Sequence, residues 1–137
     1  MFLYLLALLL APTDTYNLDQ ALNAIKMVEV GNSSGIGTIG DNGKAFGPFQ
    51  IHESYWIDSG IAGSHRQCLQ SYDYSKRVVI SYMERYAPNQ TERLKNGTAS
   101  LTDVETLARI HNGGPRGHTK KATIGYWNKV NKCLIRN

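Results

Sequence analysis

A helical apolar stripe that passes directly into a glycine-rich stretch sets the strongest limit on the fold of this sequence. Leu18, Leu22 and Ile25 recur at the i, i+4 and i+7 spacing of one helix face. Asn17 is a favourable N-cap residue, and Gln20 stands three positions later, where a capping box has its second member. We therefore predict that a helix begins at this point.

The stretch 31–43 holds five glycines and two asparagines, which predicts a backbone that turns repeatedly. Gly31 is placed to end the first helix. Residues 38–39 and 46–51 are strand candidates on either side of Asp41-Asn42-Gly43, and the Asn-Gly dipeptide favours a hairpin. We predict one small antiparallel hairpin.

The rest of the chain predicts mostly helix. The predicted helical segments are residues 52–61, 73–87, 103–111 and 119–134. Pro88 is expected to end the second of these, and Thr102 to cap the third. No internal repeat or long linker divides the chain, so we predict a single domain of the α+β class.

An unbroken apolar run from Phe2 to Ala11 is too short to span a bilayer. Small residues follow it, which is typical of a secretory signal peptide. We predict that residues 1–15 are removed by cleavage between Ala11 and Tyr16, leaving residues 16–137 as a secreted domain. The alternative is a buried N-terminal helix. No other run is long enough for a membrane span.

The net charge of +4 favours encounter with anionic surfaces such as bacterial walls, but at this magnitude plain solubility is the better explanation. No block of like charges indicates a nucleic-acid partner. Asn32, Asn89 and Asn96 each begin a glycosylation sequon in a turn-like stretch.

Cys68 and Cys133 are the two cysteines. In an exported protein they could pair across a long loop, and the alternative is two buried free thiols. No histidine cluster at ligand spacing accompanies them, so we predict neither a metal site nor a cofactor.

Glu29 continues the apolar stripe of the first helix, and Asp41 opens the hairpin turn twelve positions later. Partial burial would raise the pKa of Glu29, as a general acid requires. Two carboxylates facing one cleft can cleave a glycosidic bond. The alternatives are a solvated glutamate at a helix end and an aspartate that only shapes its turn.

Other patterns are weaker. Gly35-x-Gly37-x-x-Gly40 matches a dinucleotide fingerprint but follows a helix rather than a strand, so we reject it. No Gly-x-Ser-x-Gly elbow indicates a serine hydrolase. His111 lies on the apolar side of its predicted helix and fits a satisfied core histidine. The aromatic pairs 55–56 and 126–127 fit the core or a sugar-binding groove.

Four blocks, in this order, resemble the invertebrate-type lysozymes and destabilases. The blocks are Gly47-Pro48-Phe49-Gln50-Ile51, Tyr55-Trp56-Ile57-Asp58, residues 108–115 (ARIHNGGP) and residues 125–130 (GYWNKV). The likeness covers about residues 20–133. It implies a lysozyme-like α+β fold and hydrolysis of β-1,4 bonds between N-acetylmuramic acid and N-acetylglucosamine in bacterial peptidoglycan, without a cofactor.

The resemblance also implies roles for individual residues. Glu29 matches the acid of the family and Asp41 its nucleophile or charge stabiliser. The implied substrate contacts are His52, Glu53, Ser54, Tyr55, Trp56, Ile57, Asp58, Tyr82, His111, Asn112 and Gly113. Phe46 and Ser59 stand where the family usually has cysteines, so the chain lacks most of the disulfides of its relatives. A non-catalytic peptidoglycan-binding module and an isopeptidase of the destabilase type are the competing functions.

Overall fold

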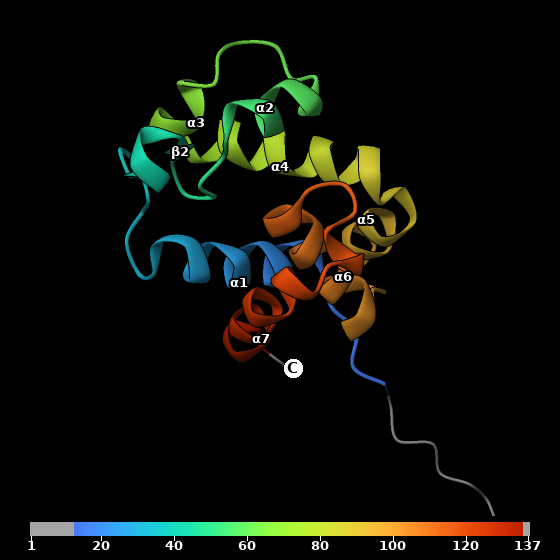
Figure 1. Cartoon of the computed structure of the whole chain (residues 1–137). Coiled ribbons are helices and arrows are strands. Elements are labelled where there is room, and N and C mark those ends of the chain that lie inside the picture. Colours follow the sequence, from blue (N-terminus) through green and yellow to red (C-terminus); the bar gives the residue numbers. More distant parts are fainter. Residues whose placement is uncertain (1–12, 136–137) are drawn as a thin grey trace, which may run out of the picture.

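The computed structural model describes residues 13–135, which form mainly helices with a small sheet at one side (Figure 1). The helices are α1 Leu18–Val30, α2 Glu53–Ser59, α3 Gln67–Gln70, α4 Tyr72–Tyr86, α5 Pro88–Lys95, α6 Leu101–Gly113 and α7 Ile124–Cys133. The strands are β1 Ile39–Gly40 and β2 Ala45–Phe46, and the 3-10 turns are η1 Asp41–Gly43, η2 Gly117–Thr119 and η3 Lys121–Thr123. The predicted α+β class is confirmed.

The packed part of the chain includes Tyr16, the first residue of the predicted secreted domain. Its side chain is buried, and its backbone N–H donates to the Ala99 carbonyl at 2.9 Å. Residues 1–12 of the predicted signal peptide lie outside the described residues, and the cleavage stays a prediction. Within residues 13–135, none of the helices has the length and apolar content needed to cross a membrane.

Helix α1 forms as the sequence predicts. Asn17 Oδ1 accepts from the Gln20 N–H and Gln20 Oε1 accepts from the Asn17 N–H, each at 2.9 Å, so the capping box is complete. Leu22 and Ile25 are fully buried. Gly31 ends the helix at φ +66°, a conformation that glycine adopts without strain.

The core lies where α4 and α6 meet α1 and α5. Its largest buried side chains come from several elements and include Leu22, Ile25, Phe49, Met83, Leu94, Leu107 and Ile110. Helix α7 packs against α1 and α6, whereas α2 and α3 pack against α4. Figure 1 shows α2, α3 and the sheet on one side of the molecule and α7 on the other.

Several predicted boundaries are wrong. Helix α6 begins at Leu101, with Ser100 as N-cap in a capping box with Asp103, so Thr102 is not the cap. Pro88 ends α4 but is also the first residue of α5, where its missing N–H costs nothing. The last helix was predicted from residue 119 but begins at Ile124, because the 3-10 turns η2 and η3 occupy most of the residues before it.

The predicted hairpin is present but shorter than expected. Ile39 pairs with Phe46, and Gly40 pairs with Ala45. The predicted strand 46–51 is wrong beyond Phe46. Gly47 and Gln50 adopt φ of +76° and +49°, so the chain turns back and Ile51 exchanges both backbone hydrogen bonds with Phe46.

Of the two alternatives left open for Cys68 and Cys133, a disulfide and two free thiols, the structure has the free thiols. Cys68 is buried on α3, which packs against α4, while Cys133 ends α7, which packs against α1 and α6. Burial raises the pKa of the Cys68 thiol to about 11, which keeps it protonated and unreactive.

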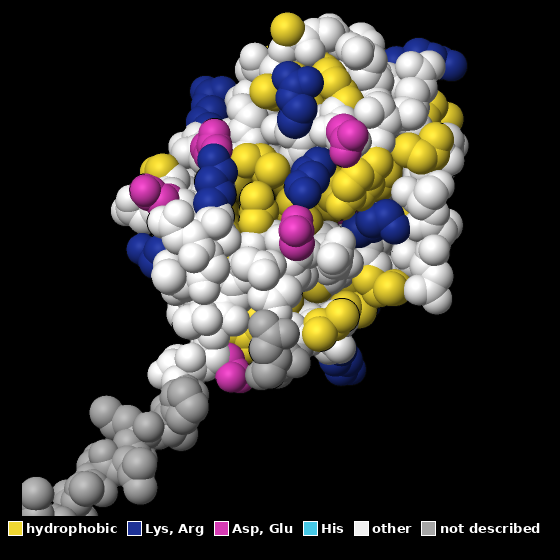
Figure 2. Space-filling view, turned by 180° about the vertical axis from the view of Figure 1, so that it is seen from behind, with side chains coloured by type: hydrophobic (Ala, Val, Ile, Leu, Met, Phe, Trp, Pro, Cys, Tyr) yellow, Lys and Arg dark blue, Asp and Glu magenta, His cyan; other side chains and the backbone are white. Residues whose placement is uncertain are grey.

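The rear face of the molecule carries basic and acidic side chains interspersed with apolar ones (Figure 2). Among the exposed charges of the molecule, Lys76 pairs with Asp19 at 3.0 Å, and Lys95 pairs with Glu84. Such a surface is typical of a solvated face. The three sequon asparagines, Asn32, Asn89 and Asn96, are exposed as well.

Candidate active site

Glu29 is the penultimate residue of α1, and its side chain is only 18% exposed. The packing of α7 against α1 brings Tyr126 to it, and the Tyr126 hydroxyl donates to Glu29 Oε1 at 2.8 Å. Burial raises the pKa of Glu29 to about 7, while the Tyr126 hydrogen bond opposes the shift because it stabilises the carboxylate. A large fraction of Glu29 is therefore protonated at neutral pH.

Asp41 lies in a different environment. It opens the η1 turn, and its side chain is 57% exposed. Its Oδ2 lies 3.1 Å from Nε2 of His52, and His52 is the residue that precedes α2.

The two carboxylates line one cavity of about 200 Å³. The other residues around it are Ala45, Gln50, His52, His111 and Asn112. The end of α1, the hairpin and the end of α6 thus meet at one opening. Glu29 and Asp41 face one cleft, as their spacing along the chain allows, and their catalytic roles stay predictions. The Glu29 carboxyl is shielded and has a raised pKa, whereas the Asp41 carboxyl is solvated. An acid and a nucleophile in glycoside cleavage need this difference in surroundings.

His111 lies between the shielded glutamate and the core. Its Nε2 is 3.1 Å from the Phe49 carbonyl, which can only accept, so Nε2 carries the proton and Nδ1 accepts from the Tyr55 hydroxyl at 2.9 Å. Burial lowers the pKa of His111 to about 4. A neutral imidazole 3.7 Å from Glu29 Oε1 leaves the glutamate without a compensating charge, which keeps its pKa high.

A second cavity, of about 310 Å³, continues from the first through Gln50, His52, His111 and Asn112. It adds several of the predicted substrate contacts, namely Ser54, Tyr55, Asp58 and Tyr82. The Tyr55 and Tyr82 rings stack with centroids 3.6 Å apart, and Tyr86 donates to Asp58 Oδ2 at 3.1 Å. The stacked Tyr55 and Tyr82 rings therefore form an aromatic wall of the cavity, and the hydrogen bond from Tyr86 fixes the position of the Asp58 carboxylate.

Three predicted contacts lie elsewhere. The Trp56 indole donates to the Tyr74 hydroxyl at 2.8 Å, and Ile57 is 61% exposed. Gly113 packs against Thr123, where a Cβ would lie 2.4 Å from a methyl group. None of the three lines a cavity beside the carboxylates within the described residues.

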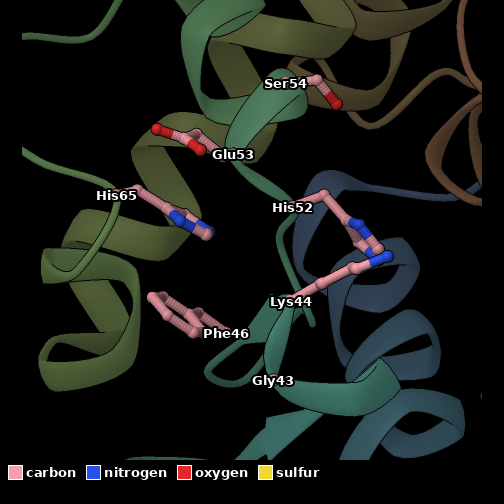
Figure 3. Close-up of a pocket in the computed structure, with 7 residues that line it drawn as sticks. All are labelled: Gly43, Lys44, Phe46, His52, Glu53, Ser54 and His65. Atoms are coloured by element: carbon pink, nitrogen blue, oxygen red, sulfur yellow. The ribbon is translucent and has the colours of Figure 1, made fainter.

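A third cavity, of about 450 Å³, also has His52 in its lining (Figure 3). Glu53, the remaining predicted contact, lines it together with Gly43, Lys44, Phe46, His52, Ser54 and His65. Among the described residues, His52 alone lines all three cavities, so they adjoin one another around it and together make up the groove.

Sequence reasoning did not assign roles to Gln50, Lys44 or His65, and it left Tyr126 between core and groove. Gln50 belongs to the block 47–51, which resembles the invertebrate-type lysozymes, and this resemblance was the signal that could have indicated a role for Gln50. Tyr126 is 97 positions from Glu29, and only the packing of α7 on α1 shows that they meet. Within the described part of the chain, no three His, Cys, Asp or Glu side chains gather as metal ligands.

Comparison with known proteins identifies the family. The family model described as Destabilase matches residues 19–133. The invertebrate-type lysozyme of Ruditapes philippinarum is 36% identical over 107 residues, which cover 77% of this chain and 73% of the relative. A lysozyme of Meretrix lusoria is 45% identical over 87 residues, covering 63% of this chain and 65% of the relative.

Coverage of the curated relatives is partial. The match to an Ostrea edulis lysozyme, at 40% identity, spans 63% of that protein, so the chain covers less than two thirds of the length of this relative and of the Meretrix protein.

Solved structures agree over a longer span. The crystal structure of Tapes japonica lysozyme matches with a TM-score of 0.68 at 32% identity, covering 90% of this chain and 94% of that one. A crystal structure of Meretrix lusoria lysozyme in complex with Aeromonas hydrophila PliI matches with a TM-score of 0.67 at 36% identity, covering 90% and 93%. With the family model spanning nearly the whole described chain, the protein is a member of the destabilase, or invertebrate-type lysozyme, family.

Proposed function

We propose that the protein is a secreted lysozyme that hydrolyses the β-1,4 bond between N-acetylmuramic acid and N-acetylglucosamine in bacterial peptidoglycan. The observation that carries the proposal is the pair of carboxyl groups, Glu29 and Asp41, in one cavity with opposite surroundings. Relatives named lysozyme at up to 45% identity support the same reaction. The groove around His52 provides room for a sugar chain on either side of the pair.

In the first half of the reaction, protonated Glu29 gives its proton to the glycosidic oxygen as the bond to C1 of the muramic acid breaks. The N-acetylglucosamine portion leaves as an alcohol. Asp41 attacks C1, or stabilises the positive charge that develops there, from the opposite side of the ring. The raised pKa of Glu29 supplies the proton near neutral pH.

In the second half, Glu29 is ionised and takes a proton from a water molecule. That water attacks C1, Asp41 is released, and the product has a free reducing end. Glu29 is protonated again, so the two carboxyl groups return to their starting states. The Tyr126 hydroxyl, which donates to Glu29 Oε1, stabilises the ionised glutamate between the two halves.

The test is to replace each carboxyl by its amide. Glu29→Gln and Asp41→Asn should each reduce release of reducing ends from peptidoglycan by at least about 10²-fold while the circular dichroism spectrum stays unchanged. Exposed acids on other surfaces give the matched controls, Glu92→Gln on α5 and Asp73→Asn on α4. Full activity in either test variant would remove that residue from its role.

A non-catalytic peptidoglycan-binding module is the main competing function. It predicts that wild-type protein is retained on insoluble peptidoglycan without any release of reducing ends. The lysozyme proposal predicts retention and release for the wild type, and retention alone for Glu29→Gln.

An isopeptidase would need a serine activated by a basic side chain. The hydroxyls of Ser59, Ser75 and Ser81 instead donate to backbone carbonyls. An ε-(γ-Glu)-Lys substrate tests this activity directly, and cleavage that survives in Glu29→Gln would show a second active site.

A further inference from the structure

The third cavity of the groove has a mixed chemical character. Figure 3 shows Lys44 and His52 on one side of it and Glu53 and His65 on the other. Lys44 and Glu53 are exposed. Within residues 13–135, an ammonium group and a carboxylate that have no ion-pair partner thus lie at opposite sides of a cavity of about 450 Å³, with the Lys44 ammonium beside the His52 ring (Figure 3).

Its floor is rigid and partly apolar. The Phe46 and His65 rings stack with centroids 4.2 Å apart and planes 7° from parallel. His65 Nε2 donates to the Ile51 carbonyl at 2.6 Å, which fixes the imidazole against the hairpin. An aromatic surface of this kind provides apolar contact area for small aliphatic groups such as methyl groups.

The cavity is adjacent to the reacting centre. His52 Nε2 lies 3.1 Å from Asp41 Oδ2, and the same side chain lines the third cavity. Lys44 follows η1, the turn that Asp41 opens. A group attached to the sugar whose C1 meets Asp41 therefore needs to extend only past His52 to enter.

We infer that this cavity receives the peptide stem of the muramic acid at the cleavage point, with Lys44 binding a stem carboxylate. The inference rests on the proposed lysozyme function. Each N-acetylmuramic acid carries on its O3 a lactyl group that is amide-bonded to a short peptide, so the stem begins on the very ring that Asp41 attacks. The stem has alanine methyl groups, free carboxylates and, at its diamino residue, an amine.

Each part of the stem finds its complement. The Lys44 ammonium matches a carboxylate, the Phe46–His65 stack matches lactyl and alanine methyl groups, and Glu53 matches an amine on the facing side. A chitin chain has neither lactyl group nor peptide and leaves these three features unused. The cavity therefore makes the protein selective for peptide-bearing glycan.

The experiment compares two forms of one substrate. Soluble glycan strands with intact stems are divided, and one half is treated with an amidase that removes the peptide and leaves the lactyl carboxylate. Lys44→Gln should raise KM roughly fivefold on intact strands with kcat unchanged, and by less than twofold on trimmed strands. Lys129→Gln, on the exposed side of α7 and not among the residues that line the three cavities, removes the same charge and should change neither.

The outcomes separate the inference from the function on which it rests. An equal rise in KM on both substrates would overturn stem recognition and leave Lys44 with a general role in the groove. No rise on either would overturn it too. Inactivity of the wild type on both substrates would instead contradict the lysozyme proposal itself. Glu53→Gln provides a second test. The KM of this variant should rise on strands whose stems have a free amine at the diamino residue, and it should not rise on strands whose stems are N-acetylated there.

Discussion

The Tyr126 hydroxyl donates a 2.8 Å hydrogen bond to Glu29 Oε1 and so joins α7 to the last turn of α1 at the candidate active site. Burial of Glu29 and this hydrogen bond act in opposite directions. Burial favours the protonated acid, and the phenol favours the carboxylate. The pKa of about 7 is the balance between them, and burial is the larger effect.

Removing the phenol should therefore raise the pKa of Glu29 further. In Tyr126→Phe the alkaline limb of the profile of kcat/KM against pH is expected to move to higher pH, because the acid keeps its proton longer. Tyr72→Phe, a tyrosine on α4, is the control that should leave the limb in place. A limb that moves to lower pH in Tyr126→Phe would contradict the assignment of that limb to Glu29.

Burial of Glu29 also has a consequence for stability. Its pKa is raised from 4.5 to about 7, so its proton stabilises the folded state fully below pH 4.5, and that stability is lost as pH rises through 7. A glutamine is neutral throughout. Glu29→Gln should exceed the wild type in free energy of unfolding by up to roughly 3 kcal/mol at pH 8, and the two should agree at pH 4. Urea unfolding at both pH values checks this, and an equal difference at both would contradict it.

Burial of His111 makes the free energy of unfolding depend on pH in the opposite direction. Burial lowers its pKa from 6.5 to about 4, so the stability that depends on its neutral form is present above pH 6.5 and is lost as pH falls through 4. The loss should approach roughly 3 kcal/mol at the acid end. NMR titration of the imidazole measures the pKa directly, with the exposed His118 as comparison signal. Titration of His111 near 6.5 would show that the ring is not buried as described.

Local patterns in the sequence were enough for α1. Asn17, Gln20 and the Leu22–Ile25 stripe are neighbours along the chain, and the helix that they predict forms with both capping hydrogen bonds. The short helices α3 and α5 were missed because they carry no apolar stripe of sufficient length. At α6 both Ser100 and Thr102 are good caps, and only the return hydrogen bond from the Ser100 N–H to Asp103 decides between them.

The site was predicted in part for the same reason. Glu29 and Asp41 are twelve positions apart on adjoining elements, so their approach is almost local. The partners that set their properties come from distant parts of the chain, Tyr126 from α7 and His111 from α6. Which distant groups meet depends on helix packing, which no local pattern in this chain specifies.

The turn after β2 makes Gly47 irreplaceable on steric grounds. Its φ is +76°, and a Cβ there would lie 1.8 Å from the Cys68 carbonyl oxygen, which belongs to rigid helix backbone. Gly47→Ala should lower the free energy of unfolding by about 2 kcal/mol or more. Gly125→Ala, in α7 with open space around it, is the control and should be neutral or slightly stabilising. Equal unfolding midpoints for the two variants would contradict the close approach of β2 to α3.

The free cysteines give a prediction that separates this chain from a disulfide-stabilised secreted domain. Protein that is purified and unfolded without any reductant should react with two equivalents of a thiol reagent, because Cys68 and Cys133 are unpaired. In native protein only Cys133 should react at an appreciable rate, since Cys68 is buried and its pKa is raised to about 11. Cys68→Ala should therefore leave the native reaction unchanged, and Cys133→Ala should remove it. Absence of free thiol in the unfolded chain would show instead that the two cysteines pair.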